Sequence, residues 1–181
     1  MTNSSTNNID LSAHEYYINR ESSLLEFQRR VLEEALDESN QLLERIKFLA
    51  ILGSNMDEFF MVRFSGLRKQ VESRMMDRAI DGKTPPEIIA ELRKTASEIY
   101  DSALNMYHKK LLPQLEKHGV HILDYKKLTP AQKERVDASF KEVIYPILTP
   151  LALDPGHPFP HISNLSLNFF IVLKDAKGRE K

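Results

Sequence analysis

Apolar residues recur every three or four positions through most of residues 15–119, and this helical period restricts the fold more than any other feature. Glycine, proline and short polar runs separate the periodic stretches, and these residues commonly end helices. The pattern predicts four helices, over about residues 23–37, 41–52, 55–76 and 84–118. We therefore expect a mainly α chain in which residues 15–119 form an antiparallel four-helix bundle.

Capping signals mark where several of these helices are expected to begin. Ser23 followed by Glu26 fits a capping box, in which each of two side chains accepts a hydrogen bond from the backbone of the other. The sequences Thr-Pro-Pro-Glu at 84–87 and Thr-Pro-Ala-Gln at 129–132 combine the same box with a proline at the first helical position. Pro113 lacks a backbone N–H, so we expect it to kink its helix or to begin a new segment.

A glycine and a polar pair interrupt the apolar pattern at residues 53–55. Gly53 can adopt the positive φ that ends a helix, and Ser54 or Asn55 can cap the helix that follows. We therefore expect a sharp helix–helix corner here, with Asn55 facing outward. Its side-chain amide carries a donor and an acceptor, as an adenine edge requires, but capping alone is the simpler explanation of this asparagine.

The pattern changes after Gly119. The alternation at 120–123 and the apolar run at 165–174 predict strands, and residues 175–178 predict a hairpin turn. A helix over about 129–145 and a proline-rich connection at 146–161 lie between them. We interpret residues 120–181 as the truncated start of an α+β domain, because the second strand lacks a partner, and residues 1–14 as a disordered tail. The chain would then be a fragment of a longer protein.

Composition excludes several classes of function. The net charge is −1, so no global field attracts nucleic acid, and the absence of cysteine removes disulfides, thiolate catalysis and zinc–thiolate sites. No glycine-rich phosphate loop occurs, and no apolar run is long enough to span a bilayer. We interpret the chain as soluble and cytoplasmic, with peripheral association with the inner membrane left open.

Other polar residues are weaker candidates for chemistry. Arg63, Arg68 and Arg74 follow the expected corner and could contact a polyanion, although a solvated helix face is the simpler explanation of them. His157 and His161 have a spacing that could bring them together on a metal, but no third ligand is evident. We predict no catalytic residue and no metal ligand in this chain.

Several long runs resemble the N-terminal region of bacterial polyphosphate kinases of the first type. They are Tyr-Ile-Asn-Arg-Glu from position 17, Leu-Glu-Arg-Ile-Lys-Phe-Leu-Ala-Ile from 43, Ser-Asn-Met-Asp-Glu-Phe-Phe-Met-Val-Arg from 54, and residues 147–168. The usual first-helix pattern, Glu-Leu-Ser-Trp-Leu-Glu-Phe-Asn, reads here Glu-Ser-Ser-Leu-Leu-Glu-Phe-Gln at 21–28. These departures predict looser packing where the first helix begins.

The resemblance implies reversible transfer of the terminal phosphate of ATP onto inorganic polyphosphate, through a phosphorylated histidine and with magnesium. It implies that Asn55 contacts the nucleotide, that residues from about 124 belong to a head domain that helps to form a dimer, and that the catalytic histidines lie in later domains. The segment alone is then expected to be inactive. Two alternatives remain: a stand-alone helical interaction or scaffold module, and a polyanion-binding module that uses the three arginines.

Overall fold

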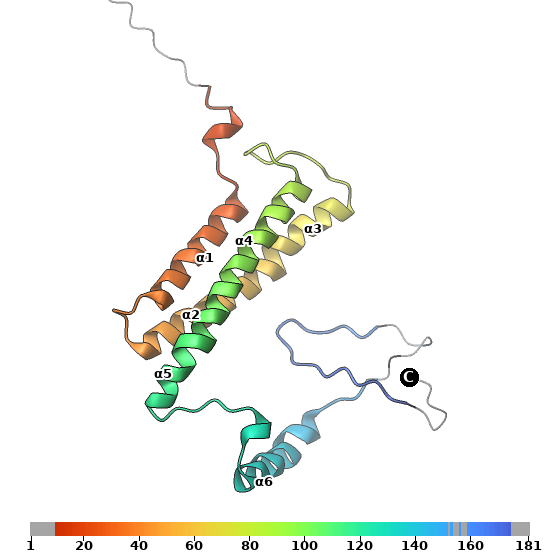
Figure 1. Ribbon diagram of the computed structural model, residues 1–181. Helices are drawn as coiled ribbons and strands as arrows, with labels where there is room; N and C mark the ends of the chain where they lie inside the picture. Colours follow the sequence, from red (N-terminus) through yellow and green to blue (C-terminus); the bar gives the residue numbers. More distant parts are fainter. Residues whose placement is uncertain (1–9, 152, 154–155, 157–158, 175–181) are drawn as a thin grey trace, which may run out of the picture. The chain divides into compact units, whose positions relative to one another are not determined.

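The computed structural model describes residues 10–151, 153, 156 and 159–174, and it is mainly α-helical (Figure 1). Residues 1–122 and 123–181 form two compact units, which we call the helical unit and the C-terminal unit. Residues 1–9 of the predicted tail at 1–14 and the predicted hairpin turn at 175–178 lie outside the described residues. Within the described residues, no helix combines the length and the hydrophobicity needed to cross a bilayer.

The four expected helices of the helical unit are present, but they are connected differently from the prediction. Two pairs of α-helices continue into one another through π-helical turns, which leaves three long helical rods (Figure 1). The first rod is α1 (Arg20–Leu36); the second is α2 (Leu42–Glu58), a π-helical segment η2 (Phe59–Phe64) and α3 (Ser65–Glu72); the third is α4 (Pro85–Met106), a π-helical segment η3 (Tyr107–Leu111) and α5 (Leu112–Lys117).

The expected corner at Gly53 is wrong, because α2 passes through residues 53–55 without a break. Gly53 is not among the residues with positive φ, and Asn55 lies in the last turn of α2 rather than at a cap. The apolar stripe explains the continuity: Leu52, Met56 and Phe59 stand at helical spacing and are at most 2% exposed. Burying them outweighs the roughly 1 kcal/mol that a glycine costs inside a helix.

Helix α1 begins earlier than predicted. Asn19 is its N-cap, and its side-chain oxygen accepts hydrogen bonds from the N–H groups of Glu21 and Ser22, at 2.9 and 3.3 Å. Ser23 therefore lies inside the first turn rather than at the cap. Asparagine satisfies the free N–H groups of a helix start at least as well as serine does, so the earlier cap is chemically sound.

Other helix ends follow the sequence signals. The N–H of Thr84 donates to the Glu87 carboxylate at 2.7 Å, and Pro113 lies in the first turn of α5. The third rod ends at Gly119, whose φ is +80°, with its N–H bonded to the Glu116 carbonyl at 3.0 Å. Helix α3 ends in the same way at Arg74, although this residue is not a glycine, with φ +57° and its N–H bonded to the Val71 carbonyl at 3.0 Å. The predicted extension to residue 76 therefore stops short.

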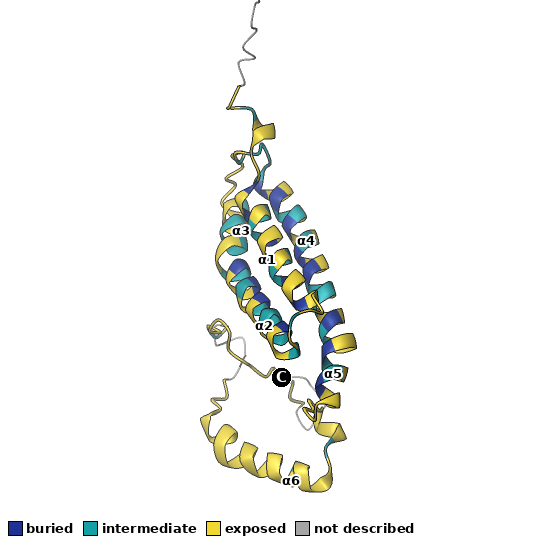
Figure 2. Ribbon diagram, turned by 90° about the vertical axis from the view of Figure 1, so that its left-hand side faces the viewer, coloured by how far each residue is buried: buried dark blue, intermediate teal, exposed yellow. Residues whose placement is uncertain are grey.

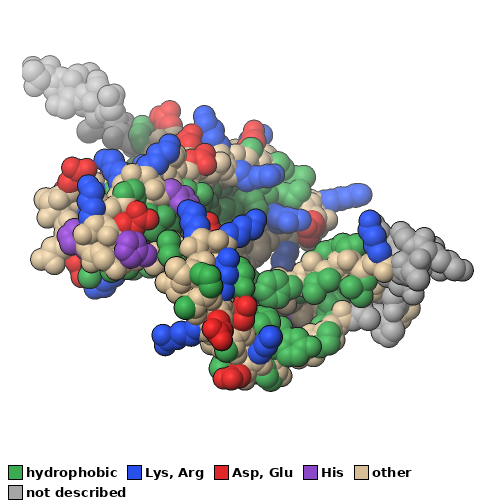
Figure 3. All heavy atoms as spheres, turned by 60° about the horizontal axis from the view of Figure 1, so that its bottom comes forward, with side chains coloured by type: hydrophobic (Ala, Val, Ile, Leu, Met, Phe, Trp, Pro, Cys, Tyr) green, Lys and Arg blue, Asp and Glu red, His purple; other side chains and the backbone are tan. Residues whose placement is uncertain are grey.

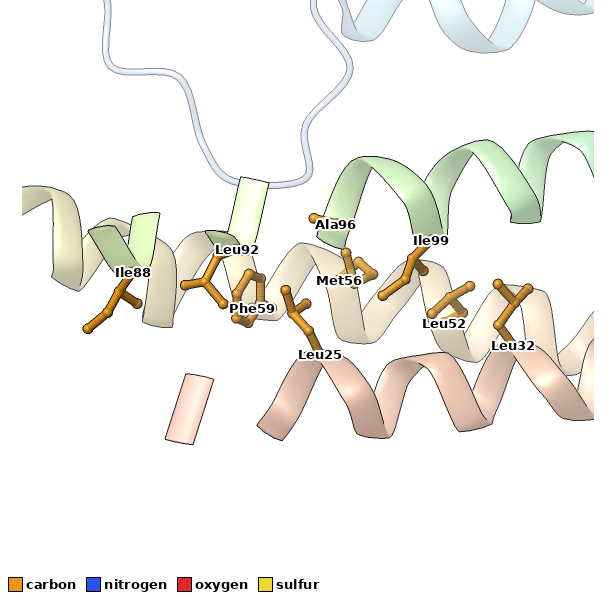
Figure 4. Close-up of a cluster of buried hydrophobic side chains, with 9 residues drawn as sticks. All are labelled: Leu25, Leu32, Leu52, Met56, Phe59, Ile88, Leu92, Ala96 and Ile99. Atoms are coloured by element: carbon orange, nitrogen blue, oxygen red, sulfur yellow. The ribbon is translucent and has the colours of Figure 1, made fainter. Parts of the chain in front are cut away.

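The core of the helical unit lies where the three rods meet (Figures 2 and 4). Its buried members are Leu25, Leu32, Leu52, Met56, Phe59, Ile88, Leu92, Ala96 and Ile99. Two large apolar residues of the periodic stretches, Phe27 and Leu43, are not part of this core and are 53% and 65% exposed. Arg45, in contrast, is buried, and its Nε donates a hydrogen bond to the Ala35 carbonyl at 2.9 Å. Its positive charge therefore offsets the partial negative charge at the C-terminal end of α1.

The described residues of the C-terminal unit form no β-strand, so the predicted α+β architecture is not seen in this part of the chain. The unit holds α6 (Pro130–Ser139), which begins at the predicted capping box, and a π-helical segment Phe140–Ile144. Residues 120–123 and 165–173 are irregular, because a strand is stable only when another strand pairs with it. Hydrophobic side chains stay at the surface of this unit (Figure 3), including Leu167 and Phe170 at 86% and 79% exposure.

Candidate functional site

Asn55 lies on the side of α2 that faces α1, and it is half-buried. Its Nδ2 donates a hydrogen bond to Oε1 of Gln28 on α1, at 2.9 Å. Asn55 Oδ1 has no hydrogen-bond donor among the described residues, and it is not one of the buried polar atoms that lack a partner. This oxygen therefore remains open to solvent, where a ligand could donate a hydrogen bond to it.

Gln28 is the hydrogen-bond partner of Asn55, and the sequence analysis did not single it out. Its side chain is 3% exposed, between Leu25 and Leu32 on the inward face of α1. The signal was present in the spacing, because Gln28 stands three residues after one core leucine and four before the other. A polar residue at such a position needs a hydrogen-bond partner, and Asn55 provides one.

The three arginines named as polyanion candidates are all exposed, and the structure does not collect them into one site. Arg63 lies in η2 and Arg74 ends α3. Arg68 lies in α3, where its guanidinium is 3.4 Å from the Glu72 carboxylate. Of the three, Arg68 alone lines a groove between α4 and the second rod.

A groove of about 890 Å³ runs between α4 and the second rod. Its lining residues are Phe60, Phe64, Arg68, Val71, Glu72, Ile89, Arg93, Ala96, Ser97 and Tyr100. Phe60 stacks on Tyr100, with ring centroids 6.4 Å apart and planes inclined by 21°. Burial, and secondarily the charge of Asp57, raise the pKa of the Tyr100 hydroxyl. The groove thus has an aromatic wall and an arginine from each side, a mixture suited to protein contacts as well as to anions.

A polar cluster joins the start of α1 to the start of α4. Lys83 and Glu91 form a short ion pair, and the hydroxyl of Ser22 donates to the other oxygen of Glu91 at 3.0 Å. The hydrogen bond from Lys83 lowers the pKa of Glu91, and the same bond raises the pKa of Lys83. These bonds tie the start of α1 to the start of α4.

No three histidine, aspartate or glutamate side chains in the described part of the chain are grouped so that they could hold a metal ion. Of the two histidines whose spacing was weighed as a metal pair, His157 lies outside the described residues. The described residues therefore do not fit a magnesium site.

Comparison with known proteins identifies two family domains in the chain. Residues 17–123 match the model of the polyphosphate kinase N-terminal domain, and residues 131–181 match that of the polyphosphate kinase middle domain. The first match alone covers more than half of the chain.

Individual relatives agree with these matches. Polyphosphate kinase of Prosthecochloris aestuarii is 44% identical over 169 residues, which cover 93% of this chain and 24% of the relative. Polyphosphate kinase of Mycobacterium leprae is 43% identical over 161 residues, covering 89% and 22%. The crystal structure of polyphosphate kinase from Porphyromonas gingivalis superimposes with a TM-score of 0.66 at 28% identity, covering 81% of this chain and 20% of that one. The chain thus spans about a quarter of the length of the relatives it matches.

Proposed function

This chain belongs to the polyphosphate kinase family, and from that premise we propose that it is the N-terminal part of an ATP:polyphosphate phosphotransferase. In this proposal the enzyme transfers the terminal phosphate of ATP reversibly to inorganic polyphosphate through a phosphohistidine supplied by other domains. Magnesium, which the family resemblance implies, would be held by residues of other domains and would neutralise phosphate charge there. The supporting observation is the pair of consecutive family domains, at residues 17–123 and 131–181, in a chain that spans 24% of its relative.

The role we propose for the helical unit is to contact the nucleotide through Asn55. Its amide is held at the surface of a rigid helix by Gln28, and Oδ1 remains open to a donor such as the exocyclic amine of adenine. A contact on a helix is more precise than one on a loop, since the backbone of α2 is fixed by the core. Asn55 binds and orients the base in this proposal, and it does not take part in the chemical step.

The C-terminal unit is proposed to contribute to assembly. Its described side chains include none that is buried, and large apolar residues such as Phe169, Phe170 and Ile171 are 67–79% exposed. An apolar surface of this kind is covered by another domain or by another subunit in a working protein. We propose that it packs within the head domain of the intact enzyme and supports its dimer.

The first experiment determines which protein carries this chain in its source cells. An antibody raised against residues 1–120 should detect a product several times heavier than 20.9 kDa. A product of 20.9 kDa would contradict the phosphotransferase proposal and would favour the stand-alone interaction module. Light scattering on the purified chain then tests that alternative, because a monomeric chain would count against it.

The second experiment tests the nucleotide contact. In the intact phosphotransferase, Asn55→Ala should raise the KM for ATP about tenfold while kcat changes little. The reason is that the substitution removes a contact that is equally strong in the bound substrate and in the transition state. Asn105→Ala is the matched control, since Asn105 is exposed on α4 and bonds only to the Asp101 carbonyl of its own helix. An unchanged KM in Asn55→Ala would remove Asn55 from the site.

A further inference from the structure

We propose that Gln28 is a positioning residue that orients the Asn55 amide and thereby sets a preference for adenine over guanine nucleotides. The proposal rests on the function proposed above, in which Asn55 contacts the base. It goes beyond that function because it assigns a specificity role to a buried residue on another helix.

The burial of Gln28 makes its hydrogen bond costly to lose. The side chain is 3% exposed and lies among core leucines, so an unpaired amide oxygen there would be stranded away from water. Its described partner for Oε1 is Nδ2 of Asn55, at 2.9 Å. The two amides are therefore coupled: while Gln28 keeps its oxygen toward Asn55, Asn55 cannot rotate its own oxygen inward without placing it against the Gln28 oxygen.

This coupling decides which chemical group Asn55 offers to a ligand. With Nδ2 turned toward Gln28, the atom left open is the acceptor Oδ1. The exocyclic amine of adenine is a donor and can bond to this oxygen, whereas the corresponding carbonyl of guanine is an acceptor and would be repelled. A site that holds an unpaired acceptor rejects the wrong base more strongly than it attracts the right one.

The packing of the core supports this function because it fixes the backbone on both sides of the Gln28–Asn55 hydrogen bond. Leu25 and Leu32 flank Gln28 on α1, and Leu52 and Met56 flank Asn55 on α2, all of them at most 3% exposed. The two backbones therefore cannot separate to let the amides turn independently. An exposed pair of amides would exchange partners with water and could not discriminate between bases.

The test compares ATP with GTP as phosphate donors in the intact enzyme. Gln28→Met keeps the length of the side chain and removes the acceptor, so it should lower the preference for ATP over GTP, measured as the ratio of kcat/KM values, about tenfold. The change should appear in the KM for ATP with kcat nearly unchanged. Gln28→Glu keeps an oxygen that accepts from Asn55, and it should retain most of the preference.

Controls separate positioning from folding. Gln70→Met makes the same change at an exposed position on α3 and should leave the ratio unchanged. In the Asn55→Ala background, Gln28→Met should cause no further loss of the preference, because the group it orients is gone. The thermal transitions of all variants show whether the fold is retained, and the side-chain amide signals of Asn55 in the purified chain should move in Gln28→Met.

The outcomes distinguish the two proposals. If Asn55→Ala leaves the KM for ATP unchanged, the nucleotide contact itself is wrong. If Asn55→Ala raises this KM but a folded Gln28→Met keeps the ATP preference, the contact stands and the positioning role of Gln28 is overturned. An additive loss in the double variant would likewise overturn it, since the two residues would then act separately.

Discussion

The helical unit and the C-terminal unit both contain large apolar side chains, but they use them in opposite ways. In the helical unit, Leu25 and Ile99 are fully buried where three rods meet. In the C-terminal unit, Leu167 and Phe170 are 86% and 79% exposed, and none of the described side chains is buried. The difference shows that apolar content alone does not make a core: a second apolar face must be available to pack against it.

The polar residues of the two units differ in the same way. The helical unit buries Gln28 and Arg45 with specific partners, the Asn55 amide and the Ala35 carbonyl. In the C-terminal unit, the described polar contact between Tyr125 and Asp137 is exposed, at 2.9 Å. A packed interior makes a polar group dependent on its partner, so we expect mutations in the helical unit to have larger and more specific effects.

The largest expected effect is a direct contrast between two phenylalanines. Phe59→Ala removes a ring that is 2% exposed and should lower the unfolding free energy of the helical unit by about 3–5 kcal/mol. Phe170→Ala changes a ring that is 79% exposed, and it should alter stability by less than about 0.5 kcal/mol. Urea unfolding followed by circular dichroism measures both. Equal losses would mean that the C-terminal unit has a core of its own.

The next prediction concerns the buried cation. Arg45→Met keeps much of the packing volume but leaves the Ala35 carbonyl without its donor, which should cost about 1–3 kcal/mol in unfolding free energy. Lys47→Met on the same helix is the control, because Lys47 is exposed and pairs only with Glu44, at 3.1 Å. If the two variants are equally stable, the guanidinium contributes nothing beyond a surface charge.

Among the residues that the structure describes, each unit contains one non-glycine residue with a left-handed backbone, and the two give a smaller comparison. Arg74 and Leu165 both have φ +57°. Arg74→Gly removes the steric cost at the end of α3 and should stabilise the helical unit by about 0.5–1 kcal/mol. Leu165→Gly should leave that unfolding transition unchanged. A destabilised Arg74→Gly variant would show that contacts of the arginine side chain stabilise the fold by more than the relief of backbone strain does.

The smallest expected effect is a dependence on pH. The pKa of Glu91 is lowered in the folded state, so its contribution is complete above the ordinary value of 4.5 and is lost as the pH falls through the lowered value. Water screens the pair, since Lys83 and Glu91 are 41% and 40% exposed, and we expect a contribution of about 0.2–1 kcal/mol. Stability measured between pH 7 and 3 should fall less in Glu91→Gln than in the unaltered chain. If the stability of the two proteins fell equally between pH 7 and 3, the contribution of Glu91 to the pH dependence would be contradicted.

The sequence predicted those features whose causes are local. Thr84, Thr129, Gly119 and Pro113 all stand where the chain begins, ends or restarts a helix, because caps, left-handed glycines and prolines act on the few residues around them. The family resemblance was equally accessible, since it depends on runs of residues rather than on their packing. The assignment of Asn55 and of the three arginines to ligands stays a prediction.

Features that depend on packing were less accessible. The Gly-Ser-Asn run at 53–55 carried a local signal for a corner, and the burial of Leu52, Met56 and Phe59 overrode it. The apolar run at 165–174 carried a local signal for a strand, and the described residues supply no partner strand that would stabilise one. Both errors come from treating a local preference as decisive where a long-range contact decides.

The amino-acid sequence by itself determined that most of residues 20–117 is helical, where several of the helices begin and end, and which family the chain belongs to. Only the tertiary structure decided that two of the expected helices form one rod and that Gln28 holds the Asn55 amide. The physical reason is the range of the forces: capping and periodicity act within a few residues, whereas Gln28 and Asn55 are 27 positions apart. They meet because α1 and α2 bury a common apolar face.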